Sequence, residues 1–188
     1  VIKIGVAAAI YPGMKEAKKD GIKYLYSGLG SEEIFAGYQR HEESEDIQEE
    51  CWAGLRGRIW EKDLTRDIIL AKSLGMEWKT PFLEPEMILT AMKVKSEDKI
   101  IPSDQKNKKK MFFRVSLGKA KQKEEGTTIK KVVIRKVAEK QGLSKEYSWR
   151  KKKAAQYGSK SDRAILRIAR KKGYKYKKEY IKSILRIK

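Results

Sequence analysis

The chain has 188 residues and a net charge of +20, with 40% hydrophobic residues and four tryptophans. This composition excludes an intrinsically disordered chain, and the length is enough for one domain with a buried core. The single cysteine, Cys51, excludes an internal disulfide and favours a reducing, cytoplasmic setting. No apolar run reaches the ~18 residues of a membrane span, and we interpret the apolar stretch 4–10 as a buried element rather than a signal peptide.

The charge is unevenly distributed along the chain. Residues 1–100 carry a net −3 and residues 101–188 a net +23, which together give +20. A strongly basic module binds polyanions such as nucleic acids, nucleotides or acidic membranes. A lysine-rich solvated surface has the same composition, so the charge alone leaves both interpretations open.

The N-terminal part predicts helices around one strand. A helix is expected over residues 3–19, kinked or split at Pro12 and ended near Gly21. Residues 22–26 predict a short buried strand, followed by a glycine-rich turn and a helix over residues 32–40. Residues 41–46 predict an acidic connector. Apolar spacing predicts a long helix over residues 46–74, which Gly54 and Gly57 are expected to break and Gly75 to end.

The rest of the chain predicts more helices. Residues 76–83 are expected to be extended and residues 84–94 to form a helix with Pro85 in its first turn. Residues 96–130 are lysine-rich, with loops expected at Gly118 and Gly126. Helices are expected over residues 128–141, 160–172 and 177–187, with Ser159 and Ser161 as candidate N-caps of the middle one. One short strand among many helices is typical of the C-terminal part of an α/β domain.

The most specific motif is residues 27–38, which read Ser-Gly-Leu-Gly-Ser-Glu-Glu-Ile-Phe-Ala-Gly-Tyr. Glycines let the backbone approach a ligand closely, and N–H groups at a helix start attract anions. Glu32 or Glu33 could hold a divalent cation in the first turn. A strand, a glycine-rich turn and an acidic helix start together suit a magnesium-bound polyphosphate.

This motif resembles the Ser-Gly-Glu-Gly-Ser/Ala-Asp-Glu-Leu-Phe-x-Gly-Tyr segment of asparagine synthetases. Residues 66–84 resemble a second segment of that family, with Glu77 and Pro81-Phe82-Leu83 matching. We expect Glu77 to pair with a nearby cation and residues 81–83 to be architectural, and we leave open the roles of Arg66 and Asp67. Residues 149–159 resemble a third family segment, in which Lys152 matches the lysine that contacts the phosphates. A solvated basic run at residues 150–153 is the alternative there.

The resemblance implies a partial adenine-nucleotide α-hydrolase-like (PP-loop) α/β domain, mostly helical with a short parallel-strand edge. Residues 1–95 would form the C-terminal half of an ATP-pyrophosphatase domain, and residues 96–188 its basic helical extension. In the family, ATP adenylates a carboxylate such as aspartate and an amine then captures the acyl group. Carried over to this chain, Ser27, Gly28 and Gly30 would face the nucleotide, Glu32 would bind Mg²⁺, and Lys152 would be the catalytic cation.

Two departures from the family affect this expectation. Leu29 stands where asparagine synthetases have a glutamate, and a leucine neither moves a proton nor binds an amine. The ATP loop Ser-Gly-Gly-x-Asp-Ser is absent from these residues, as is the glutamine-hydrolysing domain. The chain is therefore expected to be a fragment, half of a split enzyme completed by a partner chain, or a non-catalytic remnant. An RNA-binding or tRNA-modifying relative is the alternative, and Tyr174, Tyr176 and Tyr180 would either stack on bases or pack helices.

The remaining single residues predict no site of their own. His41 is the only histidine, and we expect a surface or capping role for it. Cys51 lies on the apolar face of the long helical pattern, so we expect it to pack rather than to react.

Overall fold

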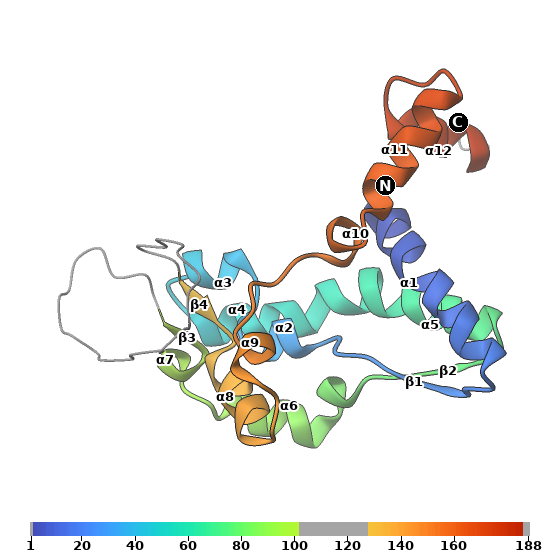
Figure 1. Cartoon of the computed structure of the whole chain (residues 1–188). Coiled ribbons are helices and arrows are strands. Elements are labelled where there is room, and N and C mark those ends of the chain that lie inside the picture. Colours follow the sequence, from blue (N-terminus) through green and yellow to red (C-terminus); the bar gives the residue numbers. More distant parts are fainter. Residues whose placement is uncertain (1, 102–127, 186–188) are drawn as a thin grey trace.

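The computed structural model describes residues 2–101 and 128–185. The loops expected at Gly118 and Gly126 lie outside these residues. Figure 1 shows an elongated body and an arm that rises from one end of it. Among the described helices, none is both long enough and apolar enough to cross a membrane.

The first helix, α1 (Ile2–Lys19), continues through Pro12 without a break, so the predicted split is wrong. A proline removes one backbone hydrogen bond, and the rest of this 18-residue helix remains intact around it. The helix ends where predicted, because Gly21 adopts a left-handed conformation with φ +76°.

A small parallel sheet confirms the predicted parallel-strand edge. Strand β1 (Tyr24–Tyr26) pairs with β2 (Glu77–Lys79), with Leu25 opposite Trp78. The prediction that this strand is buried is wrong, since Tyr24 is 51% and Tyr26 75% exposed. Among the described residues this sheet has only these two strands, so its tyrosines remain open to solvent.

The helix expected over residues 32–40 is two helices. It divides into α2 (Ser31–Ile34) and α3 (Gln39–Glu43), which extends into the predicted acidic connector. Ala36 has a left-handed φ of 55°, and Gly37 follows it. A residue in this conformation cannot continue a right-handed helix, so the chain turns sharply between the two segments.

The long helix expected over residues 46–74 forms without the predicted break. It comprises α4 (Ile47–Ala53), η1 (Gly54–Arg58), η2 (Trp60–Leu64) and α5 (Thr65–Ser73) in succession. Gly54 and Gly57 lie in a stretch of π-helix, and Gly54 has helical φ and ψ of −60° and −46°. At the predicted break, the helix continues with the wider turns of a π-helix. Gly75 ends the helix with φ +65°, as predicted.

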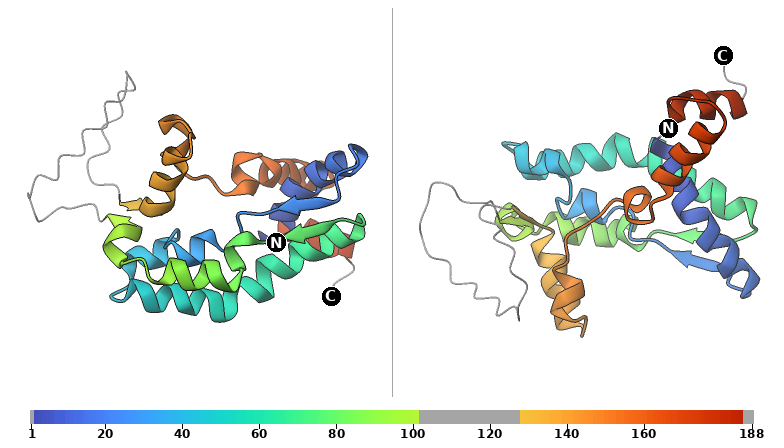
Figure 2. Two further views of the ribbon diagram at one scale, coloured as in Figure 1. Left: turned by 90° about the horizontal axis from the view of Figure 1, so that it is seen from below. Right: turned by 45° about the horizontal axis from the view of Figure 1, so that its top comes forward.

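The second half of the body completes the core. Its elements are η3 (Pro81–Leu83), α6 (Pro85–Met92), α7 (Ser96–Lys99), β3 (Ile100–Ile101), β4 (Ile129–Lys130), α8 (Val132–Lys140) and α9 (Lys145–Ser148). The antiparallel pair β3–β4 was not predicted. Figure 2 shows α6 beside the long helix. Between them lies the main apolar cluster of Ile34, Phe35, Leu55, Ile59, Leu64, Leu83 and Ala91.

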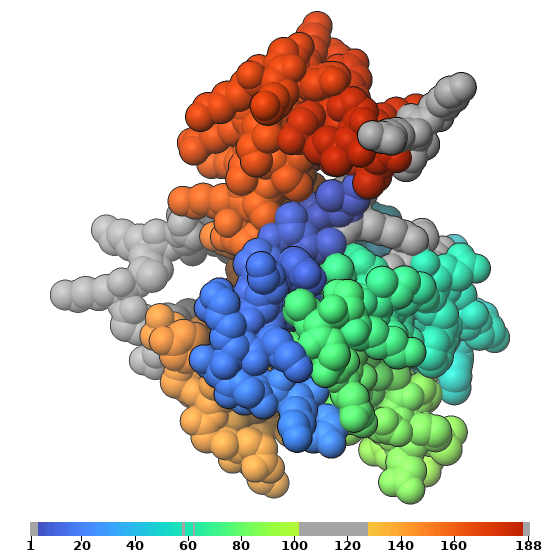
Figure 3. All heavy atoms as spheres, turned by 90° about the vertical axis from the view of Figure 1, so that its right-hand side faces the viewer, coloured from blue at the N-terminus to red at the C-terminus, as the bar shows by residue number. Residues whose placement is uncertain are grey.

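The arm consists of α10 (Ala155–Gly158), α11 (Ser161–Lys171) and α12 (Lys177–Leu185). It packs against α1, where the Ser161 hydroxyl donates a hydrogen bond of 3.0 Å to the Gly5 carbonyl. Figure 3 shows the arm projecting beyond the body above α1. The helix predicted over residues 160–172 is confirmed, and the one predicted over residues 177–187 is confirmed within the described residues. The predicted serine caps are wrong, because the N-cap position of α11 is Lys160, although the Ser159 hydroxyl accepts the Ser161 N–H at 3.3 Å. The centres of the Tyr174 and Tyr180 rings lie 5.7 Å apart, so these two side chains pack against each other, as in the helix-packing alternative.

Candidate functional site

The parallel pairing of β1 and β2 places the first two motifs side by side. The Ser27 N–H donates to the Lys79 carbonyl at 2.9 Å, which extends the pairing one residue beyond β1. Because the carboxyl ends of parallel strands lie at one edge of a sheet, the glycine-rich turn and η3 leave that edge together. In open α/β sheets this edge is where ligands bind.

The second motif supports the first by direct packing. Gly30 has φ +96°, and a Cβ atom there would lie 2.5 Å from Cδ2 of Leu83. Only glycine combines that backbone conformation with such a close approach. Leu83 is 9% exposed and belongs to the main apolar cluster, so the architectural role expected for residues 81–83 is confirmed.

Gly37 fixes the position of Glu32. A Cβ atom at Gly37 would lie 2.8 Å from Cγ and 3.0 Å from Cα of Glu32. The left-handed turn at Ala36 brings the chain back onto the first turn of α2 at this point. Two members of the first motif, five residues apart, are thus in contact, and the carboxylate of Glu32 is directed by the turn that follows it.

Glu32 lies between two lysines from the basic half of the chain. Its Oε1 lies 2.7 Å from Nζ of Lys152 and 3.3 Å from Nζ of Lys131, while its Oε2 accepts the Ser31 hydroxyl at 3.1 Å. Burial opposes ionisation of this carboxyl, but the two ammonium groups outweigh burial and lower its pKa. The predicted metal ligand and the predicted phosphate-binding lysine therefore meet at one point.

Lys131 was missed by sequence analysis. It precedes α8 with a left-handed φ of 58°, which turns its side chain towards Glu32. Its neighbour Lys130 pairs with Glu42 at 2.9 Å. The sequence offered only a lysine pair before an amphipathic helix, and neither its spacing nor its composition distinguishes it from the other lysines of residues 96–130.

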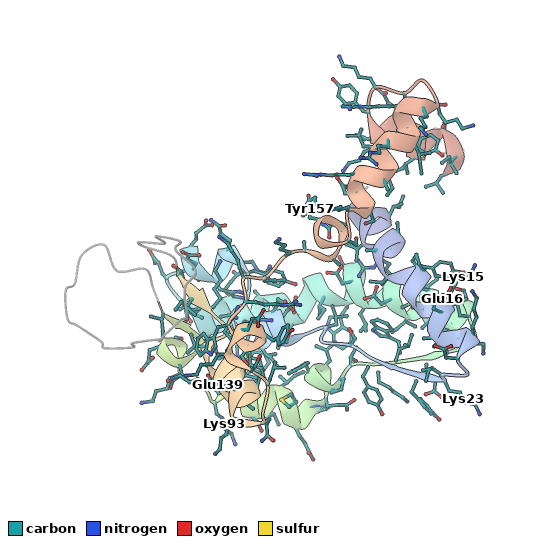
Figure 4. The ribbon with its side chains drawn as sticks, viewed as in Figure 1. Lys15, Glu16, Lys23, Lys93, Glu139 and Tyr157 are labelled. Atoms are coloured by element: carbon teal, nitrogen blue, oxygen red, sulfur yellow. The ribbon has the colours of Figure 1, made fainter. Side chains whose placement is uncertain are left out.

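Lys152 comes from an extended segment, residues 150–154, that joins α9 to α10. Polar contacts anchor the start of this segment. The Trp149 indole N–H donates to Glu139 at 2.9 Å, and Arg135 donates to the carbonyl oxygens of Ser148 at 2.8 Å and Arg150 at 3.2 Å. Figure 4 labels Glu139 on α8, which bonds to Trp149, and Tyr157 on α10, the helix that follows the segment. The Lys152 side chain remains 44% exposed.

A basic groove adjoins the Glu32 contact. It has a volume of about 860 Å³ and includes both Lys131 and Lys152 in its lining. The lining also contains apolar side chains, among them Ile134 and Leu143. A groove that combines cations with apolar side chains suits a phosphorylated organic molecule better than a bare inorganic ion.

Beside Glu32, buried polar side chains surround Tyr38. Glu33 is 3% exposed and bonds to the Tyr38 hydroxyl, and its pKa is raised because burial disfavours the carboxylate. His41 is fully buried and accepts the Tyr38 N–H at 3.1 Å through Nδ1. The predicted capping role of His41 is confirmed, and the surface alternative is wrong. Burial, followed by the nearby Arg40, lowers the pKa of His41 to about 4.

The other residues singled out from the sequence are structural. Arg66, whose role was left open, bonds to Asp67 and to Asp63, both at 2.6 Å. Glu77 pairs with Lys79 at 2.6 Å, as expected. Cys51 is fully buried and in the packing role predicted for it.

The nucleotide-facing roles of Ser27, Gly28 and Gly30 remain predictions. The Ser27 hydroxyl accepts the Leu29 N–H at 3.1 Å, and Gly28 is exposed. The α2 helix that follows has only four residues, so its dipole contributes little. Attraction for an anion at this site therefore rests on Lys131 and Lys152 rather than on the helix start.

Glu32 fits a magnesium ion that arrives with phosphates. Within residues 2–101 and 128–185, no group of three or more histidine, cysteine, aspartate or glutamate side chains could hold a metal. Mg²⁺ commonly binds through one or two carboxylates plus substrate phosphates and water, which requires no larger protein cage. The single Glu32 carboxylate, with two lysines beside it, is compatible with binding of that kind.

Comparisons with known proteins bear on the whole chain. The chain is 31% identical over 193 aligned positions to the putative asparagine synthetase [glutamine-hydrolyzing] 1 of Methanocaldococcus jannaschii, covering 95% of the chain and 35% of that protein. It is 28% identical to the root asparagine synthetase [glutamine-hydrolyzing] of Pisum sativum and to the asparagine synthetase [glutamine-hydrolyzing] of Triphysaria versicolor, covering 79% of the chain and 25% of each. The chain thus spans between a quarter and about a third of these relatives. No family model and no solved structure matches it.

Proposed function

Because the chain is related over most of its length to the asparagine synthetase family, we propose that it forms the pyrophosphate side of an ATP-dependent amide ligase site. The observation that carries this proposal is the meeting of Glu32 with Lys131 and Lys152. Lys131 and Lys152 lie 99 and 120 positions after Glu32 in the sequence. The two contacts therefore come from the tertiary fold, which joins the first motif to the basic half of the chain.

The proposed chemistry uses the two lysines as a phosphate clamp. When a carboxylate attacks the α-phosphorus of ATP, the bond to the bridging oxygen breaks and negative charge accumulates on the departing pyrophosphate. Lys131 and Lys152 would stabilise that charge, and Glu32 would hold them until the phosphates arrive. Magnesium, when bound, would neutralise further phosphate charge. The Ser-Gly-Gly-x-Asp-Ser loop that holds ATP in this family would come from outside these 188 residues.

The carboxylate substrate is proposed to be aspartate-like, and the step that captures the amine to differ from that of the family. Leu29 packs against the main apolar cluster, where the family has a polar residue. A leucine supplies no proton transfer to the incoming amine, so the acceptor must bring its own base or find one elsewhere. The division of the chain at residues 95 and 96 and the existence of a partner chain both remain proposals.

Pyrophosphate exchange tests this function. The chain would be combined with the polypeptide segment that carries Ser-Gly-Gly-x-Asp-Ser, and carboxylate-dependent exchange of labelled pyrophosphate into ATP would be measured. We expect Lys152→Ala to reduce exchange by about 100-fold or more, as expected for loss of a group that stabilises transition-state charge. Lys15→Ala, at an exposed lysine of α1 that does not line the groove, is the control and should retain exchange. Exchange that is the same in Lys152→Ala and Glu32→Ala as in the original chain would overturn the proposal.

A second candidate function is polyanion binding by the arm. The acidic residues of α11 and α12 are engaged locally, since Asp162 pairs with Lys177 and Glu179 accepts the Tyr176 N–H at 3.3 Å. The two helices carry more lysine and arginine than acidic residues, and the arm rises away from the body that contains α2 (Figure 1). Filter binding of tRNA over a salt series tests this role, because phosphate contacts predict a steep loss of affinity with salt. Weak binding that does not respond to salt would reject it.

A further inference from the structure

Tyr38 contacts the candidate site but is not one of its three charged residues, Glu32, Lys131 and Lys152. Nζ of Lys152 is 5.1 Å from the centre of the Tyr38 ring, and the guanidinium carbon of Arg40 is 4.1 Å from it. The face of an aromatic ring carries partial negative charge and attracts cations within about 6 Å. Tyr38 thus holds the ammonium group that the proposed function assigns to phosphate.

The ring itself is held firmly by its neighbours. Tyr38 begins α3, its N–H donates to Nδ1 of His41 at 3.1 Å, and the two rings stack with centres 5.8 Å apart. Its hydroxyl bonds to Glu33, which is 3% exposed. Donation to a buried carboxylate increases the electron density of the phenol, which strengthens the attraction between ring and cation. Burial, followed by Glu33 and Glu32, raises the pKa of Tyr38, so the group stays a neutral phenol.

The two contacts of Lys152 differ in what happens to them when phosphates bind. The contact with Glu32 at 2.7 Å is ionic and competes directly with phosphate for the same ammonium group. The ring contact is made through a face that carries no formal charge, so it persists when the ammonium group turns to a phosphate. A lysine on an exposed, extended segment then keeps one fixed contact throughout.

We propose that Tyr38 is a positioning residue that keeps the Lys152 ammonium group at the phosphate site through its aromatic face. This inference rests on the proposed function for the role of Lys152, whereas the contact itself is independent of that role. The hydroxyl of Tyr38 takes no part in proton transfer. The ring is required, and the hydroxyl serves to orient it.

Nuclear magnetic resonance of the full chain tests the contact. Lysines would be labelled by reductive methylation with ¹³C, and Lys152 would be assigned with Lys152→Arg. A methyl group over a ring face is shielded, so we expect the Lys152 signal at higher field than that of Lys153. The shift should persist in Tyr38→Phe and disappear in Tyr38→Leu. An unshifted Lys152 signal in the original chain would overturn the proposal, even if Tyr38→Leu fails to fold.

Titration with magnesium pyrophosphate tests the consequence. We expect Tyr38→Leu to weaken binding by about 3- to 10-fold, the range that a partly exposed cation–π contact supports, and Tyr38→Phe to change it by less than about 2-fold. In a Lys152→Ala background, Tyr38→Leu should have no further effect, because the contact is already gone. An equal loss in both backgrounds would assign Tyr38 a merely structural role. If the original chain does not bind pyrophosphate, the proposed function fails, while the ring shift still decides the contact.

Discussion

The two halves of the candidate site are built differently. The acidic half, residues 30–38, is part of the core: Ser31, Glu33, Ile34 and Ala36 are all less than 9% exposed, and the backbone around Glu32 contacts Gly37. The cationic half is the exposed segment of residues 150–153, whose Lys152 side chain is 44% exposed. Substitutions of the glycines and buried residues in the first half should therefore act on folding, and substitutions in the second half on ligand binding.

The largest expected effect is on the acidic half. Gly30→Ala should lower the free energy of unfolding by about 3–4 kcal/mol, because it adds left-handed backbone strain and a clash with Leu83. Gly28→Ala is the matched control, since a Cβ there has no neighbour within 4 Å and the φ is not left-handed. Urea denaturation measures both. A loss at Gly30 no larger than that at Gly28 would show that residues 27–31 are not fixed by Leu83.

His41, which follows the acidic half and bonds to Tyr38, should make the fold sensitive to acid. His41 has a folded pKa of about 4, below its ordinary 6.5, so the unfolded chain binds a proton more readily between these values. Stability should therefore fall as pH drops from 6.5 to 4, by about 2–3 kcal/mol from this residue alone. Urea midpoints measured across this range should show a shallower slope in His41→Asn. An unchanged slope would contradict the buried, neutral state of His41.

Lys99 is a buried lysine that can be compared with the half-exposed Lys152. It is fully buried, with Gln48 as its oxygen partner at 2.6 Å, and burial lowers its pKa. Burying a cation without a carboxylate costs free energy, so Lys99→Met should stabilise the chain by about 1 kcal/mol at neutral pH. The gain should shrink as pH rises towards the ordinary pKa of lysine, because the unfolded chain then loses its proton too. Destabilisation by Lys99→Met at every pH would argue against this.

The smallest expected effect on stability is at the cationic half. Lys152→Ala should change the free energy of unfolding by less than about 1 kcal/mol, since a half-exposed ion pair contributes little. Thermal melting of Lys152→Ala beside Lys153→Ala measures the difference. A loss as large as that of Gly30→Ala would mean that the basic segment is part of the core framework.

The sequence predicted the elements that depend on local signals. The ends of α1 and of the long helix at Gly21 and Gly75, the proline start of α6 and the parallel-strand edge are confirmed. The break of the motif helix at Ala36 was missed, because alanine is a strong helix former and its left-handed conformation is imposed by packing. The exposure of β1 was missed for a related reason, since burial depends on which elements cover a strand.

The site was predicted in its types of residue but not in its geometry. The motif resemblance singled out Glu32 and Lys152, and the structure shows that they form an ion pair at 2.7 Å. Lys131 has no distinguishing sequence signal, because only the tertiary fold brings β4 and α8 next to α2. Tyr38 was recognised as part of the first motif, while its contact with Lys152 joins segments 114 positions apart, beyond the reach of any local pattern.

The most direct test of the central claim is calorimetric titration of the full chain with magnesium pyrophosphate. The claim is that Lys131 and Lys152 act together at Glu32 as one phosphate site. We predict measurable binding that weakens by at least about 10-fold when both lysines are changed to glutamine, since each ammonium group makes a charge-assisted contact. The paired control Lys15→Gln/Lys23→Gln, at two exposed lysines that do not line the groove, should bind nearly as the original chain does. Equal binding by the two double variants would contradict the account.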